Sequence, residues 1–404
     1  MTRLLRYNSA APGLRWVGLT HGPEVPRALL YQPPISPDYA RLGDHEIVER
    51  VTAHKRALGD RLVILCHHYQ QDDVYRFADF TGDSLKLSQI ASAQKKAEFV
   101  VFCGVHFMAE TADVLTDDSV KVILPDLSAG CSMADMADLD QVEEAWDFLT
   151  ADCDDAIIPI TYVNSAANIK AFCGAHGGAC CTSSNAPLVL KWALQRGEKV
   201  LFLPDQHLGR NTACAMGHPL DSMVVYDPAE PDGGLTREQA ATARFILWKG
   251  HCSVHQLFTA KQCDAIKSAE PDRTILVHPE CNRDVVQRAD LVGSTEFIIK
   301  TVTTAPPHSK WAIGTEVHLI DRLAKTQTDK DIRSLATIQC LCTTMYRVSP
   351  QHLLWVLDEL AAGRVVNQIK VPTDVRRWSV VALERMLDNV SSEPVAIAST
   401  ATHA

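Results

Sequence analysis

Three cysteines stand at equivalent points of what reads as one unit repeated three times. Each lies in a short polar stretch after an apolar run: Cys131 in Ala-Gly-Cys-Ser-Met, Cys252 in Gly-His-Cys-Ser-Val-His and Cys342 in Cys-Leu-Cys-Thr-Thr-Met. They are too far apart along the chain for a local zinc loop. If the three units pack around an axis, the thiols can converge and leave a fourth coordination position open. An open position on a thiolate-held metal centre favours catalysis over a structural role.

Composition narrows the classes of protein to which the chain can belong. It has 404 residues, 46% hydrophobic and 22% charged, which is typical of a globular protein with two or three domains. No apolar run approaches the ~20 residues needed to span a bilayer. The first residues lack the apolar segment of a secretory signal, so we expect a cytoplasmic protein without a membrane partner.

The charge pattern argues against nucleic acid as a partner. The net charge is −10, and the sequence has no dense run of Lys or Arg. An anionic ligand must therefore be bound by local groups such as helix N-termini and not by a broad basic surface.

The cysteine count also argues against a disulfide framework. Thirteen is an odd number, and the cysteines show no short regular spacing. Metal ligation, catalysis or simple burial are the remaining uses of these thiols.

Short apolar runs alternate with amphipathic segments from residue 46 onward. This alternation is typical of βαβ units and parallel sheets, so we predict an α/β fold. The runs expected to form strands are Leu62–Leu65, Phe99–Phe102, Val120–Leu124, Ile157–Val163, Val200–Leu203, Phe245–Trp248 and Ile275–Val277.

Three successive blocks of polar residues recur in the same order, which predicts three homologous α/β units. Near the C-terminus, Ser349-Pro350 followed by apolar residues up to Leu360 predicts a capped amphipathic helix. Residues after about Ser391 read as a tail. The predicted parts are an N-terminal extension (1–44), a first unit with Cys131 (45–138), a second with Cys252 (139–256), a third with Cys342 (257–363) and a C-terminal segment (364–404).

Side chains suited to acid–base chemistry follow three of the predicted strands. Loops at the carboxyl ends of parallel strands are where α/β folds collect ligands. One such residue alone is more often hydrogen-bonded to its neighbours, but three equivalent strand ends favour one shared site. The residues are His67 and Tyr69, Tyr162 and Asn164, and His278 and Glu280.

Hydroxyl groups mark three predicted helix starts. Ser84 follows Phe-Thr-Gly-Asp, Ser183 precedes Ser-Asn-Ala-Pro, and Thr295 precedes Glu-Phe-Ile-Ile. Each is an ordinary N-cap type, yet a helix N-terminus with a hydroxyl also binds anions. Three of them facing one cavity would suit a substrate with several carboxylates or a phosphate.

The metal that the three thiols would hold stays open at this point. Three isolated thiolates suit a [4Fe–4S] cluster with one iron that no protein group coordinates, which can act as a Lewis acid. The alternatives are a zinc-dependent enzyme using the same thiols, and a non-catalytic iron–sulfur redox or sensor protein with a fourth ligand from Cys340 or Cys181. Cys340 also competes with Cys342 as the third ligand, and His255 is expected near the same cavity.

At these residues the chain resembles the quinolinate synthases. The resemblance runs from about residue 60 to about residue 360, with all blocks in the family's order. The blocks are His-His-Tyr-Gln (67–70), Ala-Asp-Phe-Thr-Gly-Asp-Ser-Leu (78–85), Phe-Met-Ala-Glu-Thr-Ala (107–112), Tyr-Val-Asn-Ser (162–165), Thr-Ser-Ser-Asn-Ala (182–186), Trp-Lys-Gly-His-Cys-Ser-Val-His (248–255), His-Pro-Glu-Cys (278–281), Gly-Ser-Thr-Glu (293–296) and Cys-Thr-Thr-Met (342–345).

The resemblance implies a fold, a reaction and a partner. The fold would be three αβα three-layer units in a pseudo-threefold arrangement around a central [4Fe–4S] cluster. The reaction would condense iminoaspartate with dihydroxyacetone phosphate to quinolinate, with loss of phosphate and water, for NAD biosynthesis. L-aspartate oxidase, which supplies iminoaspartate, would be a functional partner.

The resemblance also implies roles for individual residues. Cys131, Cys252 and Cys342 match the family's cluster ligands, and the Cys-x-x-Met pattern selects Cys342 over Cys340. The matching substrate-binding residues are His67, Ser84, Tyr162, Asn164, Ser183, His278, Glu280 and Thr295, with His67, Tyr69, Tyr162 and Glu280 as catalytic groups. The chain departs from the family's pattern at a Gly/His-rich insertion (174–178), which precedes Ser183.

Overall fold

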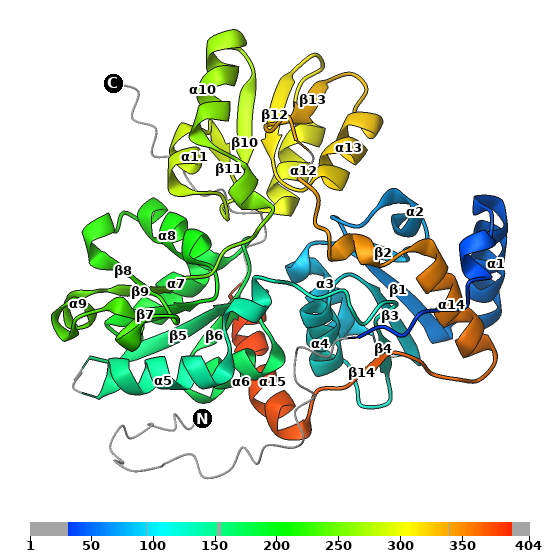
Figure 1. Cartoon of the computed structure of the whole chain (residues 1–404), viewed down its shortest axis with the longest axis horizontal. Coiled ribbons are helices and arrows are strands. Elements are labelled where there is room, and N and C mark those ends of the chain that lie inside the picture. Colours follow the sequence, from blue (N-terminus) through cyan, green and yellow to red (C-terminus); the bar gives the residue numbers. More distant parts are fainter. Residues whose placement is uncertain (1–30, 95, 152–154, 339, 390–404) are drawn as a thin grey trace, which may run out of the picture.

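The computed structural model describes residues 31–94, 96–151, 155–338 and 340–389 (Figure 1). Most of the predicted N-terminal extension and all of the predicted tail after Ser391 lie outside these residues. Within them, three separate sheets lie in three lobes that surround the middle of the molecule (Figure 1). The α/β prediction is confirmed.

The first lobe is built on a five-stranded sheet in the order β14-β4-β3-β1-β2. Its strands are β1 (Leu62–His67), β2 (Phe80–Gly82), β3 (Phe99–Cys103), β4 (Lys121–Ile123) and β14 (Gln368–Ile369), of which only β14 is antiparallel. Its helices include α1 (Asp44–Leu58), α2 (Asp72–Tyr75), α3 (Ser84–Ala93) and α4 (His106–Leu115). Strands β1 and β3 are buried throughout, as continuous apolar runs require.

The second lobe has a parallel five-stranded sheet in the order β6-β5-β7-β9-β8. Its strands are β5 (Ile157–Tyr162), β6 (Ala179–Cys181), β7 (Lys199–Leu203), β8 (Met223–Tyr226) and β9 (Phe245–Trp248). Its helices are α5 (Leu139–Thr150), α6 (Ala167–Ala175), α7 (Ala186–Leu194), α8 (Gln206–Ala215) and α9 (Arg237–Thr242).

The third lobe has a parallel four-stranded sheet in the order β11-β10-β12-β13. Its strands are β10 (Thr274–Val277), β11 (Leu291–Val292), β12 (Lys310–Gly314) and β13 (Asp331–Ser334). Its helices are α10 (Ala260–Ala269), α11 (Arg283–Arg288), α12 (Thr295–Thr304) and α13 (Val317–Thr326). Every apolar run predicted to be a strand coincides with one of β1, β3, β4, β5, β7, β9 and β10, whereas the other seven strands of the described residues were not predicted.

Each of the three cysteines lies on the segment that leaves one sheet for a helix of the next lobe. Cys131 is followed by a 3₁₀ turn (Ala134–Met136) and α5, and Cys252 by a turn (His255–Leu257) and α10. Cys342 is followed by a turn (Met345–Arg347) and α14 (Pro350–Ala361). In all three segments the helix N-cap is the seventh residue after the cysteine: Asp138, Thr259 and Ser349.

The third crossover returns the chain to the first lobe. Helix α14 begins after the predicted cap Ser349, and its Leu353 and Leu357 share one buried cluster with Ile47 and Val51 of α1. Figure 1 shows α14 beside α1. The boundaries of the three units remain a prediction, and α14 is the part of 257–363 that lies against the first lobe.

The C-terminal helix α15 (Thr373–Asp388) ties the first lobe to the second. It follows β14 and packs against α6, where Ser379 Oγ donates to the carbonyl oxygen of Ala167 at 2.7 Å. Gly174 permits this contact, because a Cβ there would lie 2.0 Å from the carbonyl oxygen of Trp378. Arg385 of α15 also donates to the carbonyl oxygen of Gly178 at 2.6 Å, so both ends of the glycine-rich segment 174–178 contact α15.

No helix in the described ranges is both long enough and apolar enough to cross a bilayer.

If α14 completes the first lobe, removing its apolar contacts should destabilise the protein. Leu357 is fully buried, so we expect Leu357→Ala to lower the free energy of unfolding by about 2–5 kcal/mol. Gln351→Ala, on the same helix, is the control and should change it by less than about 0.5 kcal/mol. Urea unfolding measures both. Equal, small effects would mean that α14 is not part of this core.

Candidate active site and metal centre

The three lobes share one cavity, whose volume is about 650 Å³ including its open mouth. All the site residues predicted from the sequence line it. They are His67, Tyr69 and Ser84 from the first lobe, Tyr162, Asn164 and Ser183 from the second, His278, Glu280 and Thr295 from the third, and Cys131, Cys252 and Cys342 from the three crossovers.

The three cysteines share one local turn. The carbonyl oxygen of each accepts the backbone N–H of the fourth residue along, from Asp135 (3.1 Å), Gln256 (3.2 Å) and Tyr346 (3.1 Å). Each sulfur also accepts a hydrogen bond from the backbone N–H of the third residue along: Ala134, His255 and Met345. Such N–H groups stabilise a thiolate more than a thiol, so all three turns are suited to ligation.

Burial keeps these thiols protonated until a cation binds. It raises the pKa of Cys131 to about 12 and raises the pKa values of Cys252 and Cys342 above the ordinary range. The thiols are close enough that negative charge on Cys131 or Cys342 raises the pKa of Cys252 further. A metal centre is what can deprotonate all three together.

Cys340 and Cys181, the competing thiols, do not line the cavity. Cys340 is buried in the core of the third lobe, with its Sγ 3.6 Å from the carbonyl oxygen of Ile338. Cys181 is buried within β6. Among the residues that the structure describes, three thiols line the cavity, which fits a cluster with three protein ligands.

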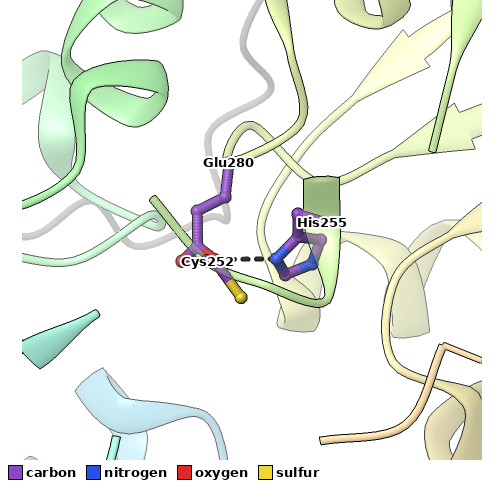
Figure 2. A group of neighbouring side chains, drawn as sticks. All are labelled: Cys252, His255 and Glu280. Carbon is purple, nitrogen blue, oxygen red and sulfur yellow. Dashed lines mark ion pairs between the residues drawn. The ribbon is translucent and has the colours of Figure 1, made fainter. Parts of the chain in front are cut away.

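Cys252, His255 and Glu280 form a second possible donor group. Their ligand atoms all lie within 4.8 Å of one another (Figure 2). His255 Nδ1 is 2.8 Å from a carboxylate oxygen of Glu280, but it has no aligned hydrogen-bond partner among the described protein groups. The expectation that His255 lies at the cavity is confirmed.

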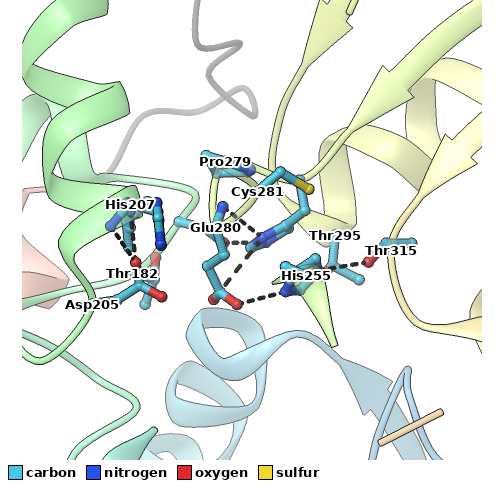
Figure 3. Close-up of polar contacts among 12 residues, drawn as sticks. Thr182, Asp205, His207, His255, Pro279, Glu280, Cys281, Thr295 and Thr315 are labelled. Atoms are coloured by element: carbon cyan, nitrogen blue, oxygen red, sulfur yellow. Dashed lines mark hydrogen bonds and ion pairs between the residues drawn. The ribbon is translucent and has the colours of Figure 1, made fainter. Parts of the chain in front are cut away.

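Glu280 is a buried carboxylate surrounded by hydrogen-bond donors (Figure 3). Burial alone would raise its pKa, but His278, His255 and a hydrogen bond from Tyr162 outweigh burial and hold the pKa of Glu280 below its ordinary value. Burial and the same carboxylate raise the pKa of Tyr162 well above the ordinary range. An ionised carboxylate thus faces a protonated phenol.

The two strand-end histidines are held neutral. Burial lowers the pKa of His67 and of His278 to about 3. His67 Nδ1 accepts the backbone N–H of Tyr69 at 3.1 Å, and His278 Nε2 lies 3.2 Å from Ser183 Oγ. The second contact joins the second and third lobes across the cavity.

The Tyr69 hydroxyl joins the first lobe to the third. It lies 2.9 Å from Thr295 Oγ1 and 2.8 Å from Thr315 Oγ1. His255 Nε2 is 3.3 Å from Thr315 Oγ1, and Figure 3 shows His255 and Thr315 together. Thr315 was not among the predicted site residues. It lies in the polar segment Gly-Thr-Glu-Val-His-Leu (314–319) that begins at the end of β12, one of the blocks that recur in the three predicted units, and this was the only signal for it in the sequence.

Two of the predicted residues lie at helix starts but do not cap the helices. Asp83 and Ser294 supply the capping oxygens of α3 and α12, so the hydroxyls of Ser84 and Thr295, the first residues of these helices, are not used as caps. Ser183 precedes α7, whose cap position is Asn185. Asp83 also lines the cavity and was missed, although its place before Ser84 is typical of a cap.

The cavity holds few charges. No Lys or Arg is among the described residues that line it. Asn164 Oδ1 is buried and has no hydrogen-bond partner among the described protein groups. Backbone N–H groups, hydroxyls and the NH₂ end of this amide are the donors available for an anionic ligand, whereas Asn164 Oδ1 can only accept a hydrogen bond from a donor on the ligand.

Comparisons with known proteins agree with the geometry. A family model described as "Quinolinate synthetase A protein" matches residues 49–388. The quinolinate synthase of Nocardioides is 55% identical over 358 residues, covering 87% of this chain and 91% of that protein. That of Acidobacterium capsulatum is 56% identical over 354 residues, covering 87% and 95%. That of Corynebacterium glutamicum is 49% identical over 385 residues, covering 95% and 98%.

The buried neutral histidines should make the protein sensitive to acid. Their pKa values are lowered by folding from the usual ~6.5 to about 3, so the unfolded state binds more protons in between and stability is lost as pH falls through that window. Between pH 6.5 and pH 5 each histidine should cost about 2 kcal/mol. Urea unfolding should show that His67→Gln loses less free energy of unfolding between pH 6.5 and pH 5 than the unmodified protein does. Equal losses in the two proteins would mean that His67 is not a buried neutral histidine.

Proposed function

We propose, since this chain belongs to the quinolinate synthase family, that it condenses iminoaspartate with dihydroxyacetone phosphate to quinolinate, releasing phosphate and water. The observation that carries this proposal is the single cavity that brings together polar side chains from three lobes and thiols from three crossovers. A cytoplasmic location and supply of iminoaspartate by L-aspartate oxidase belong to the same proposal.

The proposed ligands of one [4Fe–4S] cluster are Cys131, Cys252 and Cys342. Their common turn, with an N–H directed at each sulfur, supports this assignment. When bound, such a cluster would supply a Lewis-acidic iron at the cavity. The chain's own contribution is to hold three thiolates that burial would otherwise keep protonated.

Anionic groups of the substrates would be held without basic side chains. The first turns of α3 and α12 offer backbone N–H groups beside the hydroxyls of Ser84 and Thr295. Ser183 and the amide of Asn164 line the second lobe's side of the cavity. We assign carboxylate and phosphate oxygens to these groups.

Proton transfer would use the side chains whose protonation states follow from their surroundings in the cavity. Glu280, held as a carboxylate, is suited to accept a proton from carbon or nitrogen. Tyr162, held as a phenol, is suited to donate one, and Tyr69 is oriented by Thr295 and Thr315. The Nδ1 atoms of neutral His67 and His278 accept the backbone N–H groups of Tyr69 and Glu280, so Nε2 carries the proton of each ring and can donate a hydrogen bond to a substrate oxygen.

Neither alternative is favoured. A redox or sensor protein needs a fourth protein ligand, and neither Cys340 nor Cys181 is among the described residues at the cavity. A zinc enzyme using the same three thiols is not what the relatives' names indicate. Elemental analysis of anaerobically purified protein separates these cases, because zinc without iron or sulfide would refute the cluster.

The direct test is an anaerobic assay with iminoaspartate generated in place and dihydroxyacetone phosphate. Cluster-replete protein should form quinolinate, detected by chromatography, and protein from which the iron has been removed with a chelator should not. Absence of product from cluster-replete protein would refute the proposed reaction.

The ligand assignment predicts opposite outcomes for two cysteines two positions apart. Cys342→Ser should lose the visible absorption of the cluster and its iron, because its sulfur faces the cavity. Cys340→Ser should retain both, since that thiol is buried in the third lobe. Iron and sulfide analysis measures the difference. Retention by Cys342→Ser with loss by Cys340→Ser would reverse the assignment.

A further inference from the structure

The loop that carries Glu280 is held from outside its own lobe. Asn211, on α8 of the second lobe, is fully buried, and its Nδ2 donates to the carbonyl oxygens of Pro279 and Cys281, each at 2.8 Å. These two carbonyls flank Glu280 on either side (Figure 3). One amide group thus binds the backbone on both sides of Glu280, the residue to which the proposed reaction assigns proton transfer.

The chemistry of this contact admits only a donor. Both partners are carbonyl oxygens, which can only accept, so the NH₂ end of the Asn211 amide must face them. An isosteric carboxylate at the same position would direct an oxygen at two oxygens. The contact therefore depends on the two amide hydrogens of Asn211 and not on the size of its side chain.

A second amide holds the carbonyl between these two. Gln256 Nε2 lies 3.4 Å from the carbonyl oxygen of Glu280. Gln256 is in the turn after Cys252, the same turn that directs an N–H at the sulfur of that cysteine. Three successive carbonyls of the loop are thus held by side chains of α8 and of the second crossover.

We call the contacts of Asn211 and Gln256 with these three carbonyls the clamp. The clamp fixes the position of the Glu280 carboxylate. The loop joins β10 to α11 in the third lobe, whereas α8 belongs to the second. Glu280 must reach His255 at 2.8 Å and Tyr162 of the second lobe at the same time. Two neutral hydrogen bonds add little to global stability, but displacement of a reacting group by about 1 Å can lower a rate by about 100-fold.

We propose that Asn211, assisted by Gln256, is a positioning residue for Glu280. It holds the Glu280 carboxylate, which belongs to the third lobe, in contact with Tyr162 of the second lobe and with His255 of the Cys252 crossover. This inference rests on the proposed function, because it concerns the group assigned there to proton transfer.

The test compares Asn211→Ala and Asn211→Asp with Thr212→Val. Thr212 is the next residue of α8, is equally buried, and its hydroxyl has no partner among the described groups. It therefore controls for disturbance of the helix. All variants are purified anaerobically with their clusters, and kcat, KM, iron content and thermal midpoint are measured together.

Both Asn211 variants should lower kcat by about 10- to 100-fold, with KM for either substrate changed by less than about threefold. Asn211→Asp should be at least as impaired as Asn211→Ala. Iron content should match the unmodified protein, and Thr212→Val should retain its kcat. Unchanged kcat in both Asn211 variants, or a loss that follows iron content or thermal midpoint, would overturn the proposal.

Hydrogen exchange tests the clamp without activity. The backbone N–H of Cys281 donates to the carbonyl oxygen of His278 at 3.0 Å within this loop. Mass spectrometry should show faster exchange in the peptide over residues 276–284 of both Asn211 variants, and not of Thr212→Val. If the unmodified protein makes no quinolinate, the proposed function fails, while this exchange still decides whether Asn211 holds the loop. Equal exchange in all variants would refute the clamp.

Discussion

The ring of three crossovers is the constraint on which the rest of this structure depends. Each crossover leaves one sheet, makes the same turn at a cysteine and begins a helix of the next lobe, and the last returns through α14 to the first lobe. Because the ring closes, the positions of Cys131, Cys252 and Cys342 are set jointly by all three lobes. The strand ends that carry the polar residues face the same interior, so the cavity and the thiol site form together.

The charge balance of the cavity follows from its burial. An acidic chain with net charge −10 encloses a site with an ionised Glu280 and two histidines that burial keeps neutral. No Lys or Arg among the described lining residues offsets a bound anion. Backbone N–H groups of α3 and α12 are therefore suited to attract carboxylates, and a bound metal centre would add positive charge to the site.

Much of this arrangement could be predicted from the sequence, and the exceptions have physical reasons. Buried strands such as β1 and β5 are continuous apolar runs, whereas β12 has only three apolar residues before Gly314 and was not predicted. The spacing of the cysteines did not decide between Cys340 and Cys342, and the seven-residue interval from each cysteine to a helix cap became apparent only once the structure identified the caps. The return of α14 to the first lobe, and the contact of Asn211 with the Glu280 loop, are long-range contacts that local periodicity does not encode.

We propose that the three thiols hold a cluster whose fourth iron faces the substrate cavity. The decisive measurement is Mössbauer spectroscopy of protein carrying ⁵⁷Fe, with and without a bound dicarboxylate. One iron site in four should change its isomer shift and quadrupole splitting when the dicarboxylate binds, while the other three should keep the values of thiolate-coordinated iron. Four iron sites that all remain unchanged would contradict it.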